Sequence, residues 1–211
     1  MNYPAAPWKL KGYAVQTLQL VNIEQACKFI PSELEIVSLL PGKTLGGIYI
    51  SCYESDSFLK YNELIVVPGF VRYQEKIGVW ISHIYVDDRD SVAGGREIWG
   101  LPKEMAKFTW NNGSVSVSQN NRELCNLRYQ QGLLNFSTWW QQGFNGGSFS
   151  GLNKELLFFE YQSKSQIGLV KGNIEIHQDS PFASLSLDKP WLTLNLQNLE
   201  LIVDAPKVSY P

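Results

Sequence analysis

The sequence GGREIWGLPKE, residues 94–104, is the most informative segment of this 211-residue chain. Three glycines, a proline and a tryptophan stand here among four charged residues, and an apolar run, residues 79–86, precedes them. A polar, bent segment next to a buried strand is a usual place for a reactive group. Pro102 fixes its own φ and favours extended geometry at Leu101, so Lys103 leaves the turn in a restricted direction. Lys103 is the candidate reactive group, and the competing interpretation is a solvated lysine at a strand edge.

The composition is that of an ordinary globular protein, with 44% hydrophobic and 18% charged residues and a net charge of −2. A chain of this length can bury a full core, which predicts a single domain over residues 1–211. The slightly acidic balance argues against a nucleic-acid partner. No apolar run approaches the ~18 residues of a transmembrane helix. Three scattered cysteines fit reduced thiols, and the first residues lack a signal-peptide pattern, so a cytoplasmic location is expected.

Alternation of apolar and polar residues predicts a mostly β protein, either a barrel or a strongly bent double sheet. Pro68-Gly69 indicates a sharp bend within a strand, and Asn111-Asn112-Gly113 indicates a hairpin turn. The expected strands span residues 13–21, 34–40, 44–53, 61–71, 79–86, 115–118, 123–129, 133–140, 156–161, 167–176 and 192–203.

Only two short helices are expected. Asn22 can cap the first, which covers residues 23–30. Asp88 or Asp90 can cap the second, which runs through Ile98.

Two further segments are expected to lie outside the strands. Residues 1–11 should form a loosely attached arm, with Trp8 as its anchor. Residues 143–151 are rich in glycine, serine and asparagine, a composition typical of a loop.

Glu63 is the second candidate for chemistry, because it interrupts an apolar strand. A carboxylate there should face a polar cavity or be paired, unless it lies solvated at the mouth of the strand. His83 shares a strand face with Ile81 and Tyr85, and a satisfied core histidine is the favoured interpretation. The sequence contains neither a cluster with metal-ligand spacing nor a nucleotide-binding loop, so we expect no metal and no cofactor.

A lysine amine that loses its proton can attack a ketone and form an imine. The free side chain has a pKa of about 10.4, which desolvation or a nearby cation can lower by several units. The protonated imine withdraws electrons from the neighbouring carbon, so a β-carboxylate can leave as carbon dioxide. Such chemistry requires an apolar cavity, one lysine and a carboxylate that moves protons.

Three segments together resemble the acetoacetate decarboxylase family. These are Gly95-Arg96-Glu97 followed by Pro102-Lys103, then Tyr61-Asn62-Glu63, and Pro31 to Ile36. The resemblance implies strongly bent antiparallel sheets that form a closed cone or barrel with short flanking helices, and assembly into a homo-oligomer. It also implies a lyase in which Lys103 forms a Schiff base and Glu63 moves or positions protons. Residues that would bind substrate or support the site are Arg96, Glu97 and Tyr61.

The chain departs from that family at three positions. The family has a second lysine directly after the catalytic one, and this chain has Glu104. The family's N-terminal arginine falls near Gly12-Tyr13, and a further glutamate falls near Gly46-Gly47, where this chain has neither. If Lys103 and Glu104 lie on a strand, they point to opposite faces. These departures imply a small keto acid or related carbonyl compound other than acetoacetate.

A second resemblance is to the neoxanthin-deficiency proteins of plants, a branch of the same fold family that is required for making a xanthophyll. It rests on residues 7–12, the Leu45-Gly46-Gly47 bend, Asn62-Glu63-Leu64 and Gly100-Leu101-Pro102. The plant proteins lack the lysine that this chain keeps as Lys103. This resemblance implies an alternative function, a non-catalytic protein that binds an apolar ligand such as a carotenoid or lipid.

Overall fold

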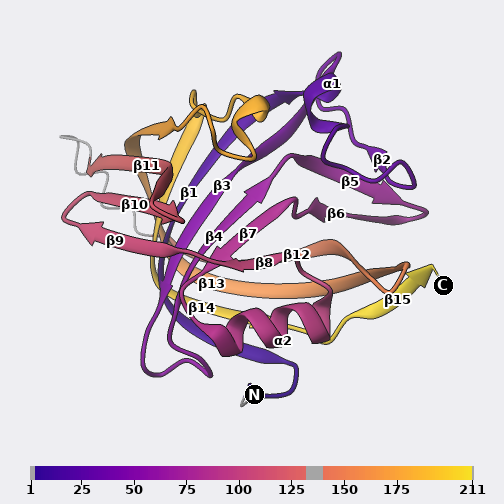
Figure 1. Cartoon of the computed structure of the whole chain (residues 1–211), viewed down its shortest axis with the longest axis horizontal. Coiled ribbons are helices and arrows are strands. Elements are labelled where there is room, and N and C mark those ends of the chain that lie inside the picture. Colours follow the sequence, from indigo (N-terminus) through magenta and orange to yellow (C-terminus); the bar gives the residue numbers. More distant parts are fainter. Residues whose placement is uncertain (1–2, 132–139, 211) are drawn as a thin grey trace.

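The computed structural model describes residues 3–131 and 140–210, which fold around one strongly bent sheet of fifteen strands (Figure 1). Its main path runs β2-β5-β6-β12-β13-β14-β1-β3-β4-β7-β8, while β9, β10 and β11 form a branch that joins at β13. The strands are β1 (Trp8–Asn22), β2 (Glu35–Ile36), β3 (Lys43–Tyr53), β4 (Asn62–Val67), β5 (Gly69–Tyr73), β6 (Lys76–Trp80), β7 (His83–Val86), β8 (Lys103–Met105), β9 (Lys107–Asn111), β10 (Ser114–Gln119), β11 (Arg122–Gln131), β12 (Trp140–Leu152), β13 (Glu155–Ile176), β14 (Leu192–Val203) and β15 (Lys207–Tyr210).

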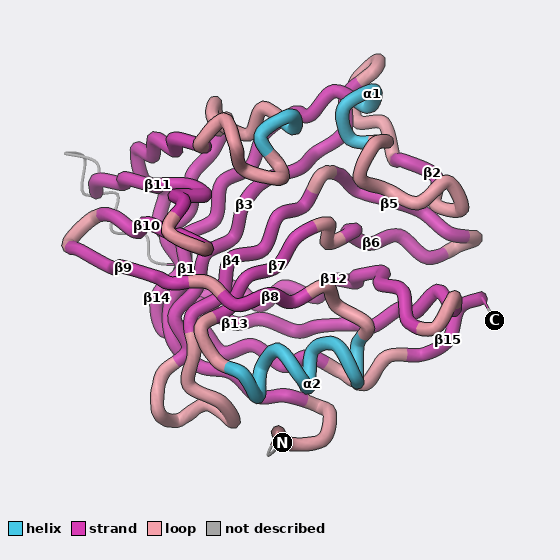
Figure 2. Tube along the Cα trace, viewed as in Figure 1, coloured by secondary structure: helices cyan, strands magenta, loops and turns pink. Residues whose placement is uncertain are grey.

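The helices are few and short, as expected, and α1 and α2 lie at opposite ends of the sheet (Figure 2). Asn22 caps α1 and Asp88 caps α2, which confirms both predicted caps, although α1 ends four residues earlier than predicted. No helix in the described ranges is both long and apolar enough to cross a membrane. The helices are α1 (Ile23–Ala26), α2 (Arg89–Trp99) and the 3-10 helix η1 (Ala183–Leu185).

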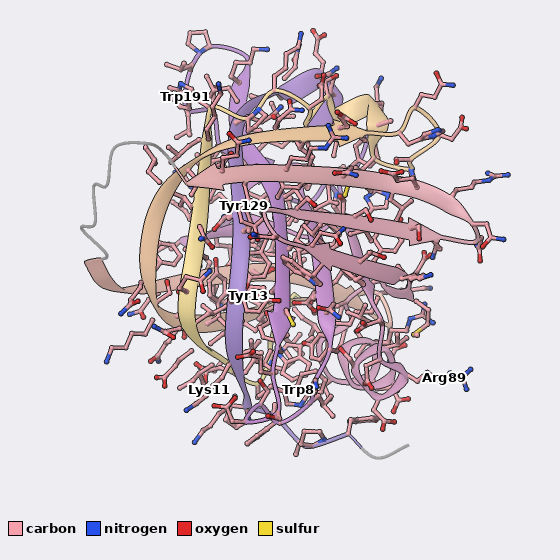
Figure 3. All side chains as sticks on the ribbon, turned by 90° about the vertical axis from the view of Figure 1, so that its left-hand side faces the viewer. Trp8, Lys11, Tyr13, Arg89, Tyr129 and Trp191 are labelled. Atoms are coloured by element: carbon pink, nitrogen blue, oxygen red, sulfur yellow. The ribbon has the colours of Figure 1, made fainter. Side chains whose placement is uncertain are left out.

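The central strands are buried on both faces. On β4, Leu64 and Val66 belong to one hydrophobic core, while Glu63, Ile65 and Val67 line a cavity on the other face. Figure 3 shows β9, β10 and β11 crossing the outer side of β1, β3 and β4, where they cover the first core. Side chains alternate between the two faces of a strand. The pairing register of β4 therefore decides at once which side chains enter the packed core and which line the cavity.

The mostly β class is confirmed, but the sheet is mixed rather than antiparallel. β7 pairs in parallel with β8, and β6 pairs in parallel with β12. A parallel pair needs a crossover connection, and α2 supplies it between β7 and β8. The main path ends at β2 and β8, and the described residues contain no ladder that joins them, so the predicted closed cone is not confirmed.

Two predicted loop segments differ from the structure. The arm predicted over residues 1–11 is already strand from Trp8, where β1 pairs with β14. The predicted anchor is confirmed, since the Trp8 indole is buried and packs edge-on against Trp99 at 4.8 Å between ring centroids. The glycine-rich loop predicted over residues 143–151 is part of β12. There Gly146 and Gly147 lie under aromatic rings of β13, and a Cβ at Gly147 would overlap the ring of Phe158.

Other strands differ from the prediction in length: some are broken or shortened, and two are joined into one. The predicted strand 79–86 is broken between β6 and β7, and 34–40 contributes only β2. The predicted strands 156–161 and 167–176 are one continuous strand, β13. The bend at Pro68-Gly69 is confirmed, since it separates β4 from β5. Almost all of the predicted strand 133–140 falls outside the described residues.

Candidate active site

The turn between α2 and β8 fixes the position of Lys103. Gly100 ends the helix in the left-handed conformation with φ of 63°, and its N–H donates to the carbonyls of Arg96 and Gly95. Lys103 then opens β8 opposite Ile84 of β7. Its side chain is 3% exposed. Glu104 is exposed and accepts a hydrogen bond from Gln119, so the prediction that Lys103 and Glu104 point to opposite faces is confirmed.

Helix α2 lies close to β8 because its inner face carries small residues. The buried positions of the helix recur at helical spacing, and three of them, Ser91, Gly94 and Gly95, are small, while Trp99 is the fourth. A Cβ at Gly95 would overlap the aliphatic stem of Lys103. A Cβ at Gly94 would lie 2.6 Å from the indole of Trp8. The two glycines therefore let the lysine stem and the indole pack directly against the helix backbone.

The ammonium of Lys103 makes three polar contacts. Its Nζ lies 2.8 Å from Oε1 of Glu63, 2.9 Å from Oγ of Ser91 and 3.5 Å from the hydroxyl of Tyr61. It also lies 4.9 Å above the ring of Tyr61 and 5.5 Å from the ring of Trp8. Since Glu63 is only 4% exposed, the lysine and the carboxylate form a buried ion pair. The interpretations of Lys103 and Glu63 as solvated side chains are excluded.

Tyrosines complete the surroundings of the Glu63 carboxylate. Tyr53 donates to Oε2 at 3.3 Å, and Tyr61 donates to Oε1 at 3.5 Å. The hydroxyl of Tyr49 lies a further 3.4 Å from that of Tyr53. Burial raises the pKa of Tyr53 and of Tyr61 well above the usual range of tyrosine. Both hydroxyls therefore stay protonated at neutral pH and act as donors to the carboxylate.

The ion pair lies in the wall of a cavity of about 460 Å³ on the concave side of the sheet. Strands β1, β3, β4, β13 and β14 supply most of the lining, and Trp99 of α2 contributes as well. Most lining side chains are aliphatic or aromatic, and many of them, such as Leu10, Trp99 and Phe159, belong to a second hydrophobic core. A lysine and a carboxylate in the wall of an apolar cavity are the groups that imine chemistry requires.

The predicted site residues divide into two groups. Lys103, Glu63 and Tyr61 meet in the cavity wall, whereas Arg96 and Glu97 are exposed on the outer side of α2. Arg96 Nε donates to the backbone carbonyl of Lys103 at 2.7 Å, so it holds the β8 backbone from outside. Glu97 accepts a hydrogen bond from the hydroxyl of Tyr3.

Three residues of the site were not predicted: Ser91, Tyr53 and Trp8. For Ser91 a signal was present, since it stands three and four residues before Gly94 and Gly95 on the same helix face. For Tyr53 and Trp8 the sequence carried no local signal, because strand pairing alone brings them to Lys103.

His83 lies away from this site and packs among aromatic rings. Its ring centroid is 5.6 Å from that of Phe29 and 5.7 Å from that of Phe182, and Nδ1 is 3.0 Å from Oγ of Ser82. Burial lowers its pKa below the usual value. These contacts confirm the interpretation of His83 as a satisfied core residue. Within residues 3–131 and 140–210, no three His, Cys, Asp or Glu side chains are grouped as metal ligands would be.

Comparison with known proteins identifies the family. Residues 3–141 match the family "Acetoacetate decarboxylase (ADC)". Protein NEOXANTHIN-DEFICIENT 1 of Solanum lycopersicum is 33% identical over 109 residues, which cover 52% of this chain and 37% of that protein. The matched segment thus spans about two fifths of the plant protein's length.

Two solved structures share the fold over almost the whole chain. Acetoacetate decarboxylase of Legionella pneumophila superposes with a TM-score of 0.76 at 17% identity, covering 99% of this chain and 89% of that one. The enduracididine biosynthesis enzyme MppR, complexed with the condensation product of pyruvate and imidazole 4-carboxaldehyde, has a TM-score of 0.67 at 13% identity, covering 100% and 91%. The match over residues 3–141 exceeds half of the sequence, and the chain therefore belongs to the acetoacetate decarboxylase family.

Proposed function

We propose that this chain is one acetoacetate decarboxylase-like domain whose Lys103 forms a Schiff base with a small keto acid or related carbonyl compound other than acetoacetate. The observation that carries the proposal is the 2.8 Å contact between Lys103 Nζ and Glu63 Oε1 in the wall of an apolar cavity. Family membership and the structural neighbours support it.

The ion pair supplies both a nucleophile and an acid. Transfer of one proton from Lys103 to Glu63 leaves a free amine and a carboxylic acid. The amine adds to the carbonyl carbon, a proton moves from nitrogen to oxygen, and the acid protonates the hydroxyl so that water leaves. The products are an iminium ion on Lys103 and a regenerated Glu63 carboxylate beside it. That carboxylate can then remove a proton from the carbon next to the iminium.

Two outcomes of the iminium are open to this site. A substrate with a β-carboxylate would lose carbon dioxide. A substrate without one would give an enamine that can condense with a second carbonyl compound, and the condensation product bound to MppR supports chemistry of this kind in the fold. The absence of an arginine near Gly12 and of a lysine at position 104 supports a substrate other than acetoacetate.

Reductive trapping tests the proposal. The protein is treated with borohydride in the presence of small ketones, aldehydes and keto acids, and the adduct is mapped by mass spectrometry. We expect a stable adduct on Lys103 that Lys103→Met abolishes. Lys107→Met is the matched control, since Lys107 is an exposed lysine of β9 and should leave the adduct unchanged. Absence of an adduct with every carbonyl compound, or an adduct only on surface lysines, would refute the Schiff-base function.

The second candidate is a non-catalytic protein that binds a carotenoid or lipid. The apolar wall of the cavity favours it, and so does the similarity to Protein NEOXANTHIN-DEFICIENT 1. This function needs the cavity but not the amine. Lys103→Met would then leave the affinity for an apolar fluorescent ligand unchanged, whereas a Schiff-base enzyme would lose its adduct in the same variant.

We also propose that the chain forms a homo-oligomer. Trp191, labelled in Figure 3, is 71% exposed and Leu169 is 69% exposed, and such large apolar side chains are often covered by a partner. Light scattering after size-exclusion chromatography would measure the mass, and a monomer at micromolar concentration would contradict this expectation. A cytoplasmic location remains a prediction from the cysteines.

A further inference from the structure

The cavity is long, and the reactive pair lies towards one end of it. On β3 the lining runs from Tyr53, beside the Glu63 carboxylate, to Leu45. Eight residue steps of a strand correspond to roughly 26 Å. On β1 the lining likewise extends from Trp8, beside Lys103, to Leu18. A ligand that reacts with Lys103 thus has a channel open to it on the concave side of the sheet.

The charges of the cavity wall cancel. Lys103 and Glu63 are the only charged residues among the described residues that line the cavity, and they lie 2.8 Å apart. Arg96 does not line the cavity, since it is exposed and bound to the backbone of Lys103 from outside. The remaining polar lining groups are neutral hydroxyls and one amide, such as Ser163, Ser165 and Gln16.

A carboxylate or phosphate on the ligand would therefore find no unpaired cation among the described lining residues. Burying an anion without a cation or a full set of donors costs several kcal/mol, and a shared Lys103 would leave Glu63 unpaired in its place. An apolar chain would instead be bound favourably, because each CH₂ group buried in the cavity strengthens binding by about fourfold. The charge balance and the length of the cavity together select against the anionic substrates that an arginine-bearing site would hold.

We propose that the site takes an uncharged aldehyde or ketone that carries an extended apolar chain, with its carbonyl at Lys103 and its chain directed along β3 towards Leu45. This inference rests on the proposed Schiff-base function and narrows its substrate class. The amine forms the C–N bond to the carbonyl carbon and the carbonyl oxygen leaves as water. Because the ligand has no β-carboxylate, carbon dioxide is not released. Glu63 instead takes a proton from the adjacent carbon and returns one, so that carbon exchanges hydrogen with solvent.

Two matched ligand series test the proposal in the intact chain. The first is 2-ketones from butan-2-one to decan-2-one, and the second is 2-oxo acids of the same lengths. The ligand concentration that gives half-maximal borohydride trapping at Lys103 is measured for each compound. Exchange of the α-hydrogens in D₂O is followed by NMR. We expect the half-saturating concentration to be at least 100-fold lower for decan-2-one than for butan-2-one. Each 2-oxo acid should bind at least tenfold more weakly than the ketone of equal length.

A cavity variant separates chain binding from the chemistry. Val67 lines the cavity four residues along β4 from Glu63, so Val67→Phe should shorten the channel without touching the ion pair. We expect the ratio between the half-saturating concentrations of butan-2-one and decan-2-one to be much smaller in Val67→Phe than in the wild type. The ligand series in the wild type stands on its own if this variant fails to fold.

The results distinguish the two levels of the proposal. Adducts that form better with 2-oxo acids than with ketones, or a half-saturation independent of chain length, would overturn the uncharged apolar substrate and leave the Schiff base intact. No adduct at Lys103 with either series would overturn the Schiff-base function and the substrate class with it.

Discussion

Removing the Glu63 carboxylate should destabilise the fold far more than removing the whole ion pair. In Glu63→Gln the shape of the side chain is kept, but the Lys103 ammonium stays buried without its counter-charge. Two unit charges 2.8 Å apart attract by about 6 kcal/mol at an effective dielectric constant of 20. Their desolvation offsets much of that attraction. Breaking such a pair by removing one partner costs about 3–5 kcal/mol, which is the expected loss for Glu63→Gln.

The double variant should recover most of this loss. In Glu63→Gln with Lys103→Met, no buried charge remains and the methionine can fill the space of the lysine stem. The free energy of unfolding is measured by urea titration with tryptophan fluorescence for the wild type, both single variants and the double variant. We expect a coupling free energy between positions 63 and 103 of at least ~2 kcal/mol.

A surface ion pair provides the matched control. Arg128 and Glu175 lie 3.6 Å apart with side chains 62% and 59% exposed, so Glu175→Gln should change stability by less than ~1 kcal/mol. Two results together would show that the carboxylate and the ammonium are not a buried pair. Glu63→Gln would lower the free energy of unfolding as little as Glu175→Gln does, and the losses caused by Glu63→Gln and Lys103→Met would simply add in the double variant. The assignment of Glu63 as the partner of Lys103 would then be refuted.

Three further predictions concern the surroundings of the site and the core. Gly95→Ala should abolish trapping at Lys103, because the new methyl group overlaps the lysine stem, whereas Gly143→Ala, with no atom nearer than 4.0 Å, should leave trapping intact. Asp88→Ala should lower the free energy of unfolding by about 1 kcal/mol in urea titration, since it removes the cap of α2, and Asp188→Ala serves as the comparison. The pKa of His83 is lower in the folded protein than in the unfolded chain. As the pH falls below about 6.5, the unfolded chain therefore binds the proton more strongly, and the free energy of unfolding decreases. The midpoint temperature of thermal unfolding should decrease less between pH 7 and pH 5 in His83→Gln than in the wild type. An equal decrease in both proteins would contradict this account.

The sequence predicts the reactive pair because each member breaks a local pattern. Lys103 follows a proline at the end of a bent segment, and Glu63 interrupts an apolar strand, so both are visible without knowledge of the fold. Glu63 is buried because β4 is covered on both faces, and Lys103 is buried because α2 and Trp8 cover its side of β8. Local rules suffice for these two residues and for the caps Asn22 and Asp88.

Long-range pairing explains what the sequence does not predict. The sequence predicts that Trp8 anchors an arm, but no nearby residue shows that it packs on Trp99. Gly146 and Gly147 of β12 indicate a loop until the rings of β13 cover them, and the parallel pairing of β7 with β8 arises only when α2 crosses between them. Arg96 and Glu97 stand next to Gly95 in sequence, yet a helix turns them away from the cavity by geometry alone.

The pairing of Trp8 with Val203 has a consequence for how the protein is made. Strand β14 completes one wall of the cavity, yet it leaves the ribosome long after β1. A nascent chain therefore exposes the lysine, the carboxylate and the apolar inner faces of β1, β3 and β4 until β14 has been translated. Contacts between residues so far apart in the sequence form slowly. Until they form, the chain exposes apolar surface and is prone to aggregate. Synthesis rate and chaperone supply should thus govern the yield of folded protein more strongly than its final stability does.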